Sequence, residues 1–186
     1  MFVCLGWGSL VWNPDTLPVL EPWRHDGPTL PIEFARQSKD GRITLVIGES
    51  FAPVQVLWVS LAVSTLEEAR NALAIREEIR ALNVERSVGV WSETTASGHA
   101  EAISIGEWAR TIGADGVVWT ALRPRFDDRL LTPTCDQVID YLSGLRGEAR
   151  QLAEQYARRA PAQIRTDYRA AIEHEFGWTA ETNGEH

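Results

Sequence analysis

The chain has 186 residues with a formal net charge of −8, and 44% of its residues are hydrophobic against 24% charged. This composition is typical of a globular protein with one full core. The negative charge argues against nucleic acid as a partner, because phosphate contacts need a basic surface. Two cysteines without CxxC spacing, no basic-then-apolar leader and no long apolar stretch predict a reduced, cytoplasmic protein without a membrane partner.

Six segments are predicted to be strands because they are short, apolar and rich in β-branched or aromatic residues. Asp40-Gly41 supplies a hairpin turn between two of them. The run VQVLWVSLAV is apolar almost throughout, which predicts one strand covered on both faces. Residues 13–31, rich in proline and glycine, predict an irregular excursion. The predicted strands are 2–5, 32–36, 43–47, 54–63, 87–94 and 116–122.

Three S/T-x-x-E/Q sequences stand at segments with helical apolar spacing and predict capped helix starts. The first helix is expected to end or bend near IREE, because Arg76 would otherwise fall in the middle of its apolar arc. Residues 148–176 are expected to be helical, with a break or bend at Pro161. The three capping sequences are Ser64-x-x-Glu67, Ser104-x-x-Glu107 and Thr134-x-x-Gln137, and the last two helices are expected to end at Ile112 and Leu145.

The turn GWGS at residues 6–9 places two glycines around a tryptophan, directly after the first predicted strand. It matches neither the GxSxG nucleophile elbow nor a complete GxGxxG or phosphate-binding P-loop. A strand that ends in a glycine turn can offer backbone N–H groups to an anion such as a carboxylate. A connection that needs glycine for its own geometry is an equally good interpretation.

Among the acidic residues, Glu77 and Glu78 stand where the helical apolar pattern fails. A carboxylate at a buried helix end has its charged form disfavoured by desolvation, which raises its pKa toward the range useful for acid–base catalysis. The alternative is an exposed Arg-Glu-Glu turn, which the pattern alone favours. The four histidines include no HExxH sequence and no pair four residues apart on a predicted helix, so no metal site is predicted.

Four ordered segments over residues 2–90 resemble the γ-glutamylcyclotransferase superfamily, and most closely its ChaC branch. GWGSLVWNP resembles the FGYGSLIW signature, with Trp7 in place of a tyrosine, and IEFARQS followed by GRITLVI resembles RRFxxxS…GxxxxLV. VQVLWVSLAV takes the place of the central strand, and LAIREE stands where the family has LDxRE. The resemblance implies an α+β fold, a small mixed β-barrel with flanking helices. Here this would be a single domain of residues 1–186, with a barrel-like core at 1–122 and a helical C-terminal extension at 134–176.

The resemblance also implies a cytoplasmic enzyme of glutathione metabolism that needs no cofactor and acts on a small γ-glutamyl amine or peptide. The α-amine of the substrate attacks its own γ-carbonyl, releases 5-oxoproline and expels the attached amine or peptide. Glu77 would be the acid/base residue, with Glu78 as its natural control. The residues implied to bind the substrate are Leu5, Gly6, Trp7, Gly8, Ser9, Leu10 and Arg36.

Other interpretations stay open at this point. A binding or regulatory module could keep the same cleft without catalysis, and an amide hydrolase could use the same carboxylate to activate water. Arg36 has a surface salt bridge as its alternative role. The three tyrosines all lie in the C-terminal third, so a tyrosine near the leaving group is expected to be absent or displaced. Neither the leaving group, the role of the C-terminal helices nor the oligomeric state follows from the sequence.

Overall fold

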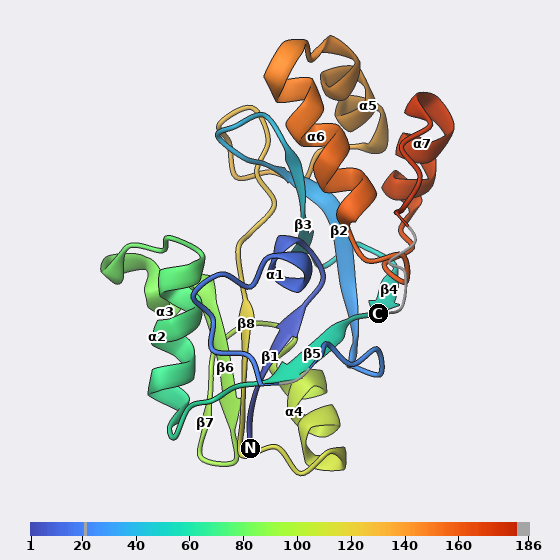
Figure 1. The fold of residues 1–186 in the computed structure, drawn as a ribbon. Coiled ribbons are helices and arrows are strands. Elements are labelled where there is room, and N and C mark those ends of the chain that lie inside the picture. The colour runs from blue at the N-terminus through green and yellow to red at the C-terminus, as the bar shows by residue number, and fades with distance from the viewer. Residues whose placement is uncertain (21, 182–186) are drawn as a thin grey trace. The chain divides into compact units, whose positions relative to one another are not determined.

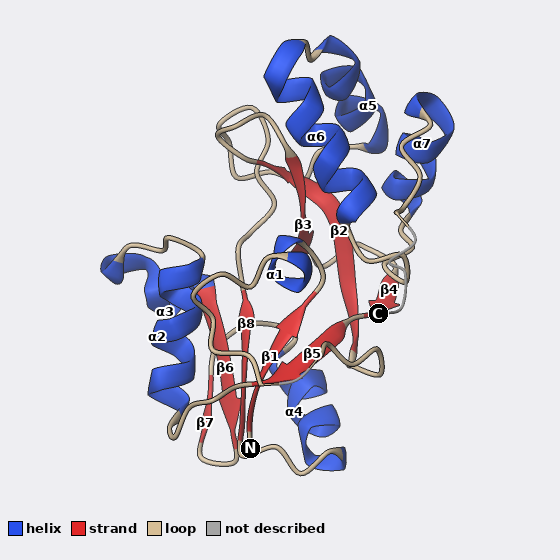
Figure 2. Ribbon diagram, in the orientation of Figure 1, coloured by secondary structure: helices blue, strands red, loops and turns tan. Residues whose placement is uncertain are grey.

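The computed structural model describes residues 1–20 and 22–181, and there the chain is α+β, as predicted (Figure 1, Figure 2). The described residues divide into two compact units, each with its own sheet. That the whole chain forms a single domain stays a prediction. The first unit comprises Met1–Gly6, the described residues of Asn13–Leu30, and Gln55–Leu122; the second comprises Trp7–Trp12, Pro31–Val54 and the described residues from Arg123 onward.

The first unit is built on a five-stranded mixed sheet. Its strands in spatial order are β5 (Leu57–Ser60), β1 (Phe2–Gly6), β8 (Gly116–Thr120), β6 (Val88–Ser92) and β7 (Thr95–Ala96). Strand β1 pairs antiparallel with β5 and parallel with β8, and β6 pairs antiparallel with both β8 and β7. The helices of this unit are α2 (Leu66–Arg76), α4 (Ala102–Thr111), and the shorter η1 (Ala81–Asn83) and α3 (Val84–Ser87).

Helices α2 and α4 cover opposite faces of this sheet (Figure 1). A Cβ atom at Gly116 would press on Leu66 of α2, whereas the ring of Trp91 lies against Gly106 of α4. Trp91 pairs with Val117, the neighbour of Gly116 in β8. Because successive strand residues point to opposite faces, the two helices lie on different sides. This double cover explains why β1 and β8 are apolar almost throughout.

The second unit contains a three-stranded sheet in the order β3-β2-β4. The predicted hairpin is confirmed, because β2 and β3 pair antiparallel and Gly41 in the turn has a φ of 88°, which favours glycine. The predicted capping box at Thr134 is also confirmed. Its elements, of which β2 begins and β4 ends in residues counted with the first unit, are β2 (Thr29–Gln37), β3 (Ile43–Ile47), β4 (Pro53–Gln55), α1 (Ser9–Trp12), α5 (Cys135–Gly144), α6 (Gly147–Arg159) and α7 (Asp167–Phe176).

The predicted single strand at 54–63 is wrong, because the chain there forms β4 and β5, which belong to different sheets. Between them, the Val56 N–H donates to the Pro28 carbonyl at 3.0 Å, and the Val56 carbonyl accepts from the Gly27 N–H at 3.1 Å. The segment around Val56 therefore pairs with the excursion that precedes β2. Continuous apolarity indicates burial, but it does not reveal where a strand changes partners.

The predicted closed β-barrel is not confirmed, because the described strands form two open sheets. In a barrel every strand pairs on both sides. In the five-stranded sheet β5 and β7 are the two edges, and β7 has only two residues. Such a short strand cannot close a sheet of this size. The helical C-terminal part at 134–176 is confirmed by α5, α6 and α7, with the break around Pro161 between α6 and α7.

Two predicted helix starts are corrected by side-chain hydrogen bonds. Helix α2 is capped by Thr65 rather than Ser64, because the Thr65 hydroxyl accepts from the Glu68 N–H at 3.1 Å. Helix α4 begins before Ser104, whose hydroxyl turns back to the Glu101 carbonyl at 3.0 Å inside the first turn. At α2 two neighbouring hydroxyl residues could cap the helix and the folded backbone selects Thr65, whereas at α4 the N-cap residue Glu101 makes no side-chain capping bond.

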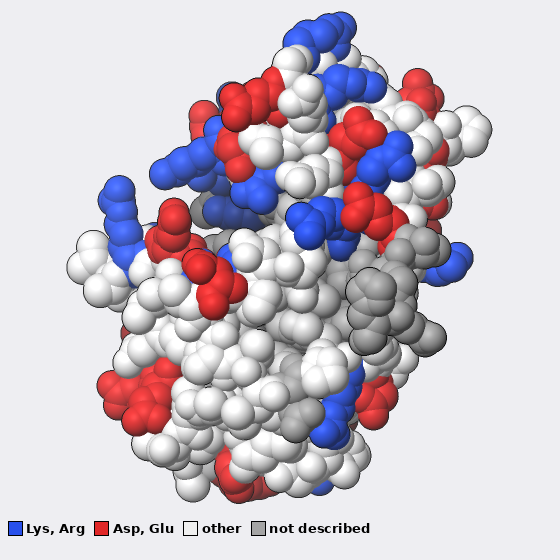
Figure 3. All heavy atoms as spheres, in the orientation of Figure 1, with Lys and Arg blue, Asp and Glu red and all other residues white. Residues whose placement is uncertain are grey.

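Among the residues that the structure describes, no helix is long and apolar enough to cross a membrane. On the face drawn in Figure 3, basic and acidic side chains are interspersed over α5 and α6 at the top of the view. The helical part of the second unit therefore presents both signs of charge on that face.

Candidate functional site

The structure separates Glu77 from Glu78. Helix α2 ends at Arg76, as the sequence predicts, and Glu77 is its C-cap residue. Glu78 follows with a φ of 51°, a left-handed conformation that stops the helix. The Glu77 side chain is only 18% exposed, whereas Glu78 is exposed. The alternative of a fully exposed Arg-Glu-Glu turn therefore applies to Glu78 but not to Glu77.

An ion pair orients the Glu77 carboxylate. Nη1 of Arg76 lies 3.0 Å from Oε1 of Glu77. The guanidinium is itself held by the backbone, because its Nε and Nη2 donate to the Asn13 carbonyl at 3.2 and 2.6 Å. Since the Arg76 side chain is largely buried, the pair is shielded from bulk water and its geometry is well defined. The expected elevation of the Glu77 pKa stays a prediction.

The Glu77 carboxylate also lies close enough to Cys4, in the middle of β1, to act on its thiol. Burial raises the pKa of the Cys4 thiol, the negative charge of Glu77 raises it further, and Arg76 opposes that effect. A thiol in this environment stays protonated and does not act as a nucleophile. Cys4 precedes Gly6 by two residues, so within the first unit Glu77 lies near the strand that leads into the glycine turn.

The residues of that turn belong to both units. Leu5 and Gly6 end β1 in the first unit, and the following residues open the second unit. The side chains of Leu5, Trp7 and Leu10 are buried, so that these residues can offer a ligand only their backbone. The Trp7 indole N–H is already used, since it donates to the Leu45 carbonyl at 3.2 Å. Ser9, the first residue of α1, is more exposed than its neighbours.

Gly8 has a structural reason to be glycine. A Cβ atom there would meet the hydroxyl of Tyr156 well inside normal contact distance. That hydroxyl accepts a hydrogen bond from the Leu45 N–H at 3.1 Å, and the tyrosine is buried. Its ring contacts Trp12 and Phe34 edge-on, with ring centroids 5.4 and 6.2 Å away. Helix α6 thus brings a tyrosine hydroxyl against the turn.

Sequence reasoning missed Tyr156, because it judged proximity to the turn by chain position. Tyr156 shares the buried face of α6 with Ala153, Ala157 and, just beyond the helix, Ala160. A large aromatic residue among alanines on a buried helix face indicates close packing against a neighbouring segment. The spacing was visible in the sequence, but the segment that α6 packs against was not.

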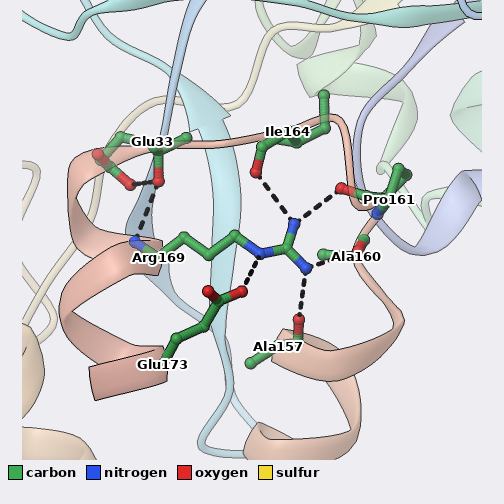
Figure 4. Close-up of polar contacts among 8 residues, drawn as sticks. Glu33, Ala157, Ala160, Pro161, Ile164, Arg169 and Glu173 are labelled. Atoms are coloured by element: carbon green, nitrogen blue, oxygen red, sulfur yellow. Dashed lines mark hydrogen bonds and ion pairs between the residues drawn. The ribbon is translucent and has the colours of Figure 1, made fainter. Parts of the chain in front are cut away.

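A buried arginine anchors the end of α6. In Figure 4 the Arg169 guanidinium points from α7 at the carbonyl groups where α6 ends. Its Nη2 donates to Ala157 and Ala160 at 3.3 and 2.9 Å, and its Nη1 donates to Pro161 and Ile164 at 2.7 and 3.0 Å. Ala157 lies in the last turn of α6, where carbonyl groups have no partner within the helix, Ala160 is the C-cap residue, and Pro161 and Ile164 follow in the connection to α7. These hydrogen bonds hold the last turn of α6, which carries Tyr156.

Two further arginines lie on the aromatic residues next to the turn. The Arg42 guanidinium carbon lies 5.6 Å from the Tyr156 ring centroid, and that of Arg159 lies 5.9 Å from the Trp12 ring centroid. Both distances fit cation–π contacts. Arg42 is also ion-paired with Asp40 at 2.7 Å. One guanidinium group therefore lies against each of the two aromatic residues, and that of Arg42 is balanced by Asp40.

Arg36 lies in β2, two residues after Phe34. It stands opposite Thr44 of β3, and its Nη1 donates to the Arg123 carbonyl at 2.7 Å. No carboxylate lies within ion-pair distance of Arg36 among the described residues, so the surface salt bridge is not seen there. In residues 1–20 and 22–181, no His, Cys, Asp and Glu side chains form a group of three or more that could hold a metal ion.

Comparisons of the chain with protein-family models, with curated proteins and with solved structures find no match.

Proposed function

We propose that the chain is a γ-glutamyl cyclotransferase-like enzyme of the cytoplasm, which releases 5-oxoproline from a small γ-glutamyl amine or peptide without a cofactor. The observation that carries the proposal is the Glu77 carboxylate. It stands at the end of α2, mostly buried, oriented by Arg76 and close to β1. The sequence resemblance of four ordered segments to the γ-glutamylcyclotransferase superfamily supports the same assignment.

The proposed reaction needs one proton acceptor that later returns its proton. Glu77 takes a proton from the α-ammonium group of the substrate, and the free amine attacks the γ-carbonyl carbon. The new C–N bond closes the ring of 5-oxoproline. Glu77 donates its proton to the leaving nitrogen, and the bond between that nitrogen and the carbonyl carbon breaks. The ring nitrogen then loses its remaining extra proton to the free Glu77 carboxylate, which passes it to the released amine. One positioned carboxylate can perform these transfers in turn, and a substrate held in a folded conformation supplies a large part of the rate.

The proposed substrate contacts of the turn are made by its backbone. Because the side chains of Leu5, Trp7 and Leu10 are buried, the N–H groups of residues 5–10 are the groups proposed to stabilise negative charge on the substrate. The Ser9 hydroxyl is proposed as a further polar group, and Arg36 as a charged one.

A panel of γ-glutamyl peptides and γ-glutamyl alkylamines tests the proposal, with 5-oxoproline measured by mass spectrometry. Wild type is expected to release 5-oxoproline from at least one member. Glu77→Gln is expected to lower turnover by about 10²- to 10⁴-fold, the range typical of general acid–base catalysis. Glu78→Gln is the matched control, since it removes the neighbouring exposed carboxylate and is expected to keep near wild-type turnover.

Three outcomes would contradict the proposal. Glutamate instead of 5-oxoproline would show that water, not the α-amine, attacks the substrate, as in an amide hydrolase. Binding of panel members by the folded protein without any product would indicate a binding module. Equal loss in the Glu77 and Glu78 variants would show that Glu77 is not the acid/base residue.

A further inference from the structure

Arg36 and Arg125 stand directly opposite each other on neighbouring extended segments. The Gln37 N–H donates to the Arg125 carbonyl at 2.7 Å, and the Arg125 N–H donates to the Ala35 carbonyl at 3.1 Å. These bonds make a parallel bridge in which Arg36 and Arg125 are the paired residues. Neighbouring strands lie about 4.7–4.9 Å apart, and the side chains of two residues paired across them leave the same face. Both guanidinium groups can therefore reach one ligand.

Among the described residues, Arg125 has a carboxylate partner, whereas Arg36 has none. The Arg36 side chain donates a hydrogen bond to the backbone carbonyl of Arg123, and no described carboxylate forms an ion pair with Arg36. Burial lowers the pKa of Arg36, and the positive charge of Arg125 lowers it further. Like charges placed directly opposite each other on paired strands are destabilising. A bound anion between them would remove that repulsion.

Arg125 forms an ion pair with an exposed carboxylate, that of Asp128. Nη2 of Arg125 lies 2.7 Å from Oδ1 of Asp128, whose side chain is 95% exposed. Ion pairs in such positions are weak, because water competes for both groups. The loop that carries Asp128 is held by a hydrogen bond from the Asp127 N–H to Oε1 of Gln37 at 2.9 Å. The Asp128 carboxylate thus occupies a place that another oxyanion can take without disrupting the loop.

We propose that Arg36 and Arg125 together bind the oxyanion of a small ligand, a carboxylate or a phosphate group, which displaces Asp128 from Arg125. Arginine is suited to this role because its planar guanidinium group binds two oxygens of such an anion at once. The site lies within the second unit, and it stands whether or not the chain cyclises γ-glutamyl substrates.

Titration with inorganic phosphate and, separately, with glutarate tests the proposal. The side-chain Nε–Hε signals of the arginines, followed by NMR spectroscopy, report binding without any need for turnover. Arg36→Gln and Arg125→Gln are each expected to weaken binding by about tenfold, the loss typical of one hydrogen bond to a charged group. Arg123→Gln is the matched control and is expected to bind within about twofold of wild type, because the side chain of Arg123 is exposed and Arg36 uses only its carbonyl. The probe that binds more tightly identifies the ligand as phosphate or carboxylate.

A second pair of variants tests the displacement. Asp128→Asn removes the internal competitor and is expected to tighten binding, whereas Asp127→Asn, which alters an adjacent exposed carboxylate, is expected to change it less. If Arg36→Gln and Arg125→Gln bind both probes like wild type, the proposal is wrong. It is equally wrong if Arg123→Gln loses as much affinity as they do, or if both aspartate variants behave alike. Glu77→Gln is expected to bind the probes normally, so that failure of this site and failure of the proposed function are told apart.

Discussion

Glu77 in the first unit and Glu33 in the second are both withdrawn from solvent, but their surroundings differ. Glu33, only 3% exposed, accepts hydrogen bonds from the Phe34 and Tyr168 N–H groups and from the Thr166 hydroxyl at the start of α7. Glu77 is paired with a guanidinium and keeps part of its side chain exposed. The Glu33 carboxylate, surrounded by neutral donors, holds the start of α7 in place. The Glu77 carboxylate, oriented by a charged group and still partly accessible, can exchange protons with a substrate.

The arginines of the two regions repeat this contrast. Arg169 is buried, and its donors are directed at carbonyl groups of its own chain and at Glu173 (Figure 4). Arg76 divides its donors between a backbone carbonyl and the carboxylate of Glu77. The depth of burial alone therefore does not identify a functional charge. What the charge is bonded to is more informative.

The largest effect on stability is expected from Arg169→Met. The variant removes the charged hydrogen bonds to the end of α6 and leaves buried carbonyl groups without partners, so we expect the free energy of unfolding to fall by about 3 kcal/mol. Urea unfolding followed by circular dichroism measures the change. Arg165→Met, at an exposed position of the same connection, is the control and is expected to be nearly neutral. If the free energy of unfolding falls no more in Arg169→Met than in Arg165→Met, the hydrogen bonds of Arg169 do not stabilise the end of α6. The contrast between Arg169 and Arg76 would then be wrong.

A smaller and different effect is expected from Arg76→Gln. If Arg76 positions the acid/base carboxylate, kcat for 5-oxoproline release falls by about tenfold while KM changes little. Arg76→Lys keeps the charge but loses the forked geometry, and it is expected to recover only part of kcat. Arg80→Gln, an exposed arginine that follows the end of α2, serves as the control. A rise in KM with unchanged kcat would instead place Arg76 in substrate binding.

The smallest effect is expected in the pH dependence of stability at Glu33. Burial raises the pKa of this carboxyl group, three hydrogen-bond donors oppose that effect, and the negative charge of Asp167 adds to the rise, so that the pKa lies above its ordinary value. The folded state therefore favours the protonated form, and this contribution to stability is present at low pH and is lost as the pH rises through the folded-state pKa. The free energy of unfolding of wild type minus that of Glu33→Gln is expected to fall as the pH rises above 4.5, the ordinary pKa of a glutamate carboxyl group. A difference that rises over this range would show that the hydrogen bonds prevail over burial.

Much of the secondary structure was predictable because it depends on local chemistry. The hairpin turn at Asp40-Gly41 was predictable because glycine readily adopts the positive φ that this turn has. The start of α5 was predictable because Thr134 and Gln137 have the spacing of a capping box. The end of α2 near Arg76 was predictable from the failure of its apolar pattern. Predictions failed where two local solutions compete, as at the start of α2, or where one apolar run serves two sheets, as around Val56.

The candidate site divides in the same way. The sequence by itself determined that Glu77 follows a helix and that a glycine turn follows the first strand, since both are local patterns. Only the tertiary structure decided that Glu77 is oriented by Arg76, that Tyr156 packs on Gly8, and that Arg36 faces Arg125. The physical reason is that each arrangement depends on a segment distant in the chain. The Asn13 carbonyl holds the Arg76 side chain, Tyr156 of α6 packs on Gly8, and the segment of Arg125 pairs with β2. Chain spacing does not reveal which distant segment makes such a contact.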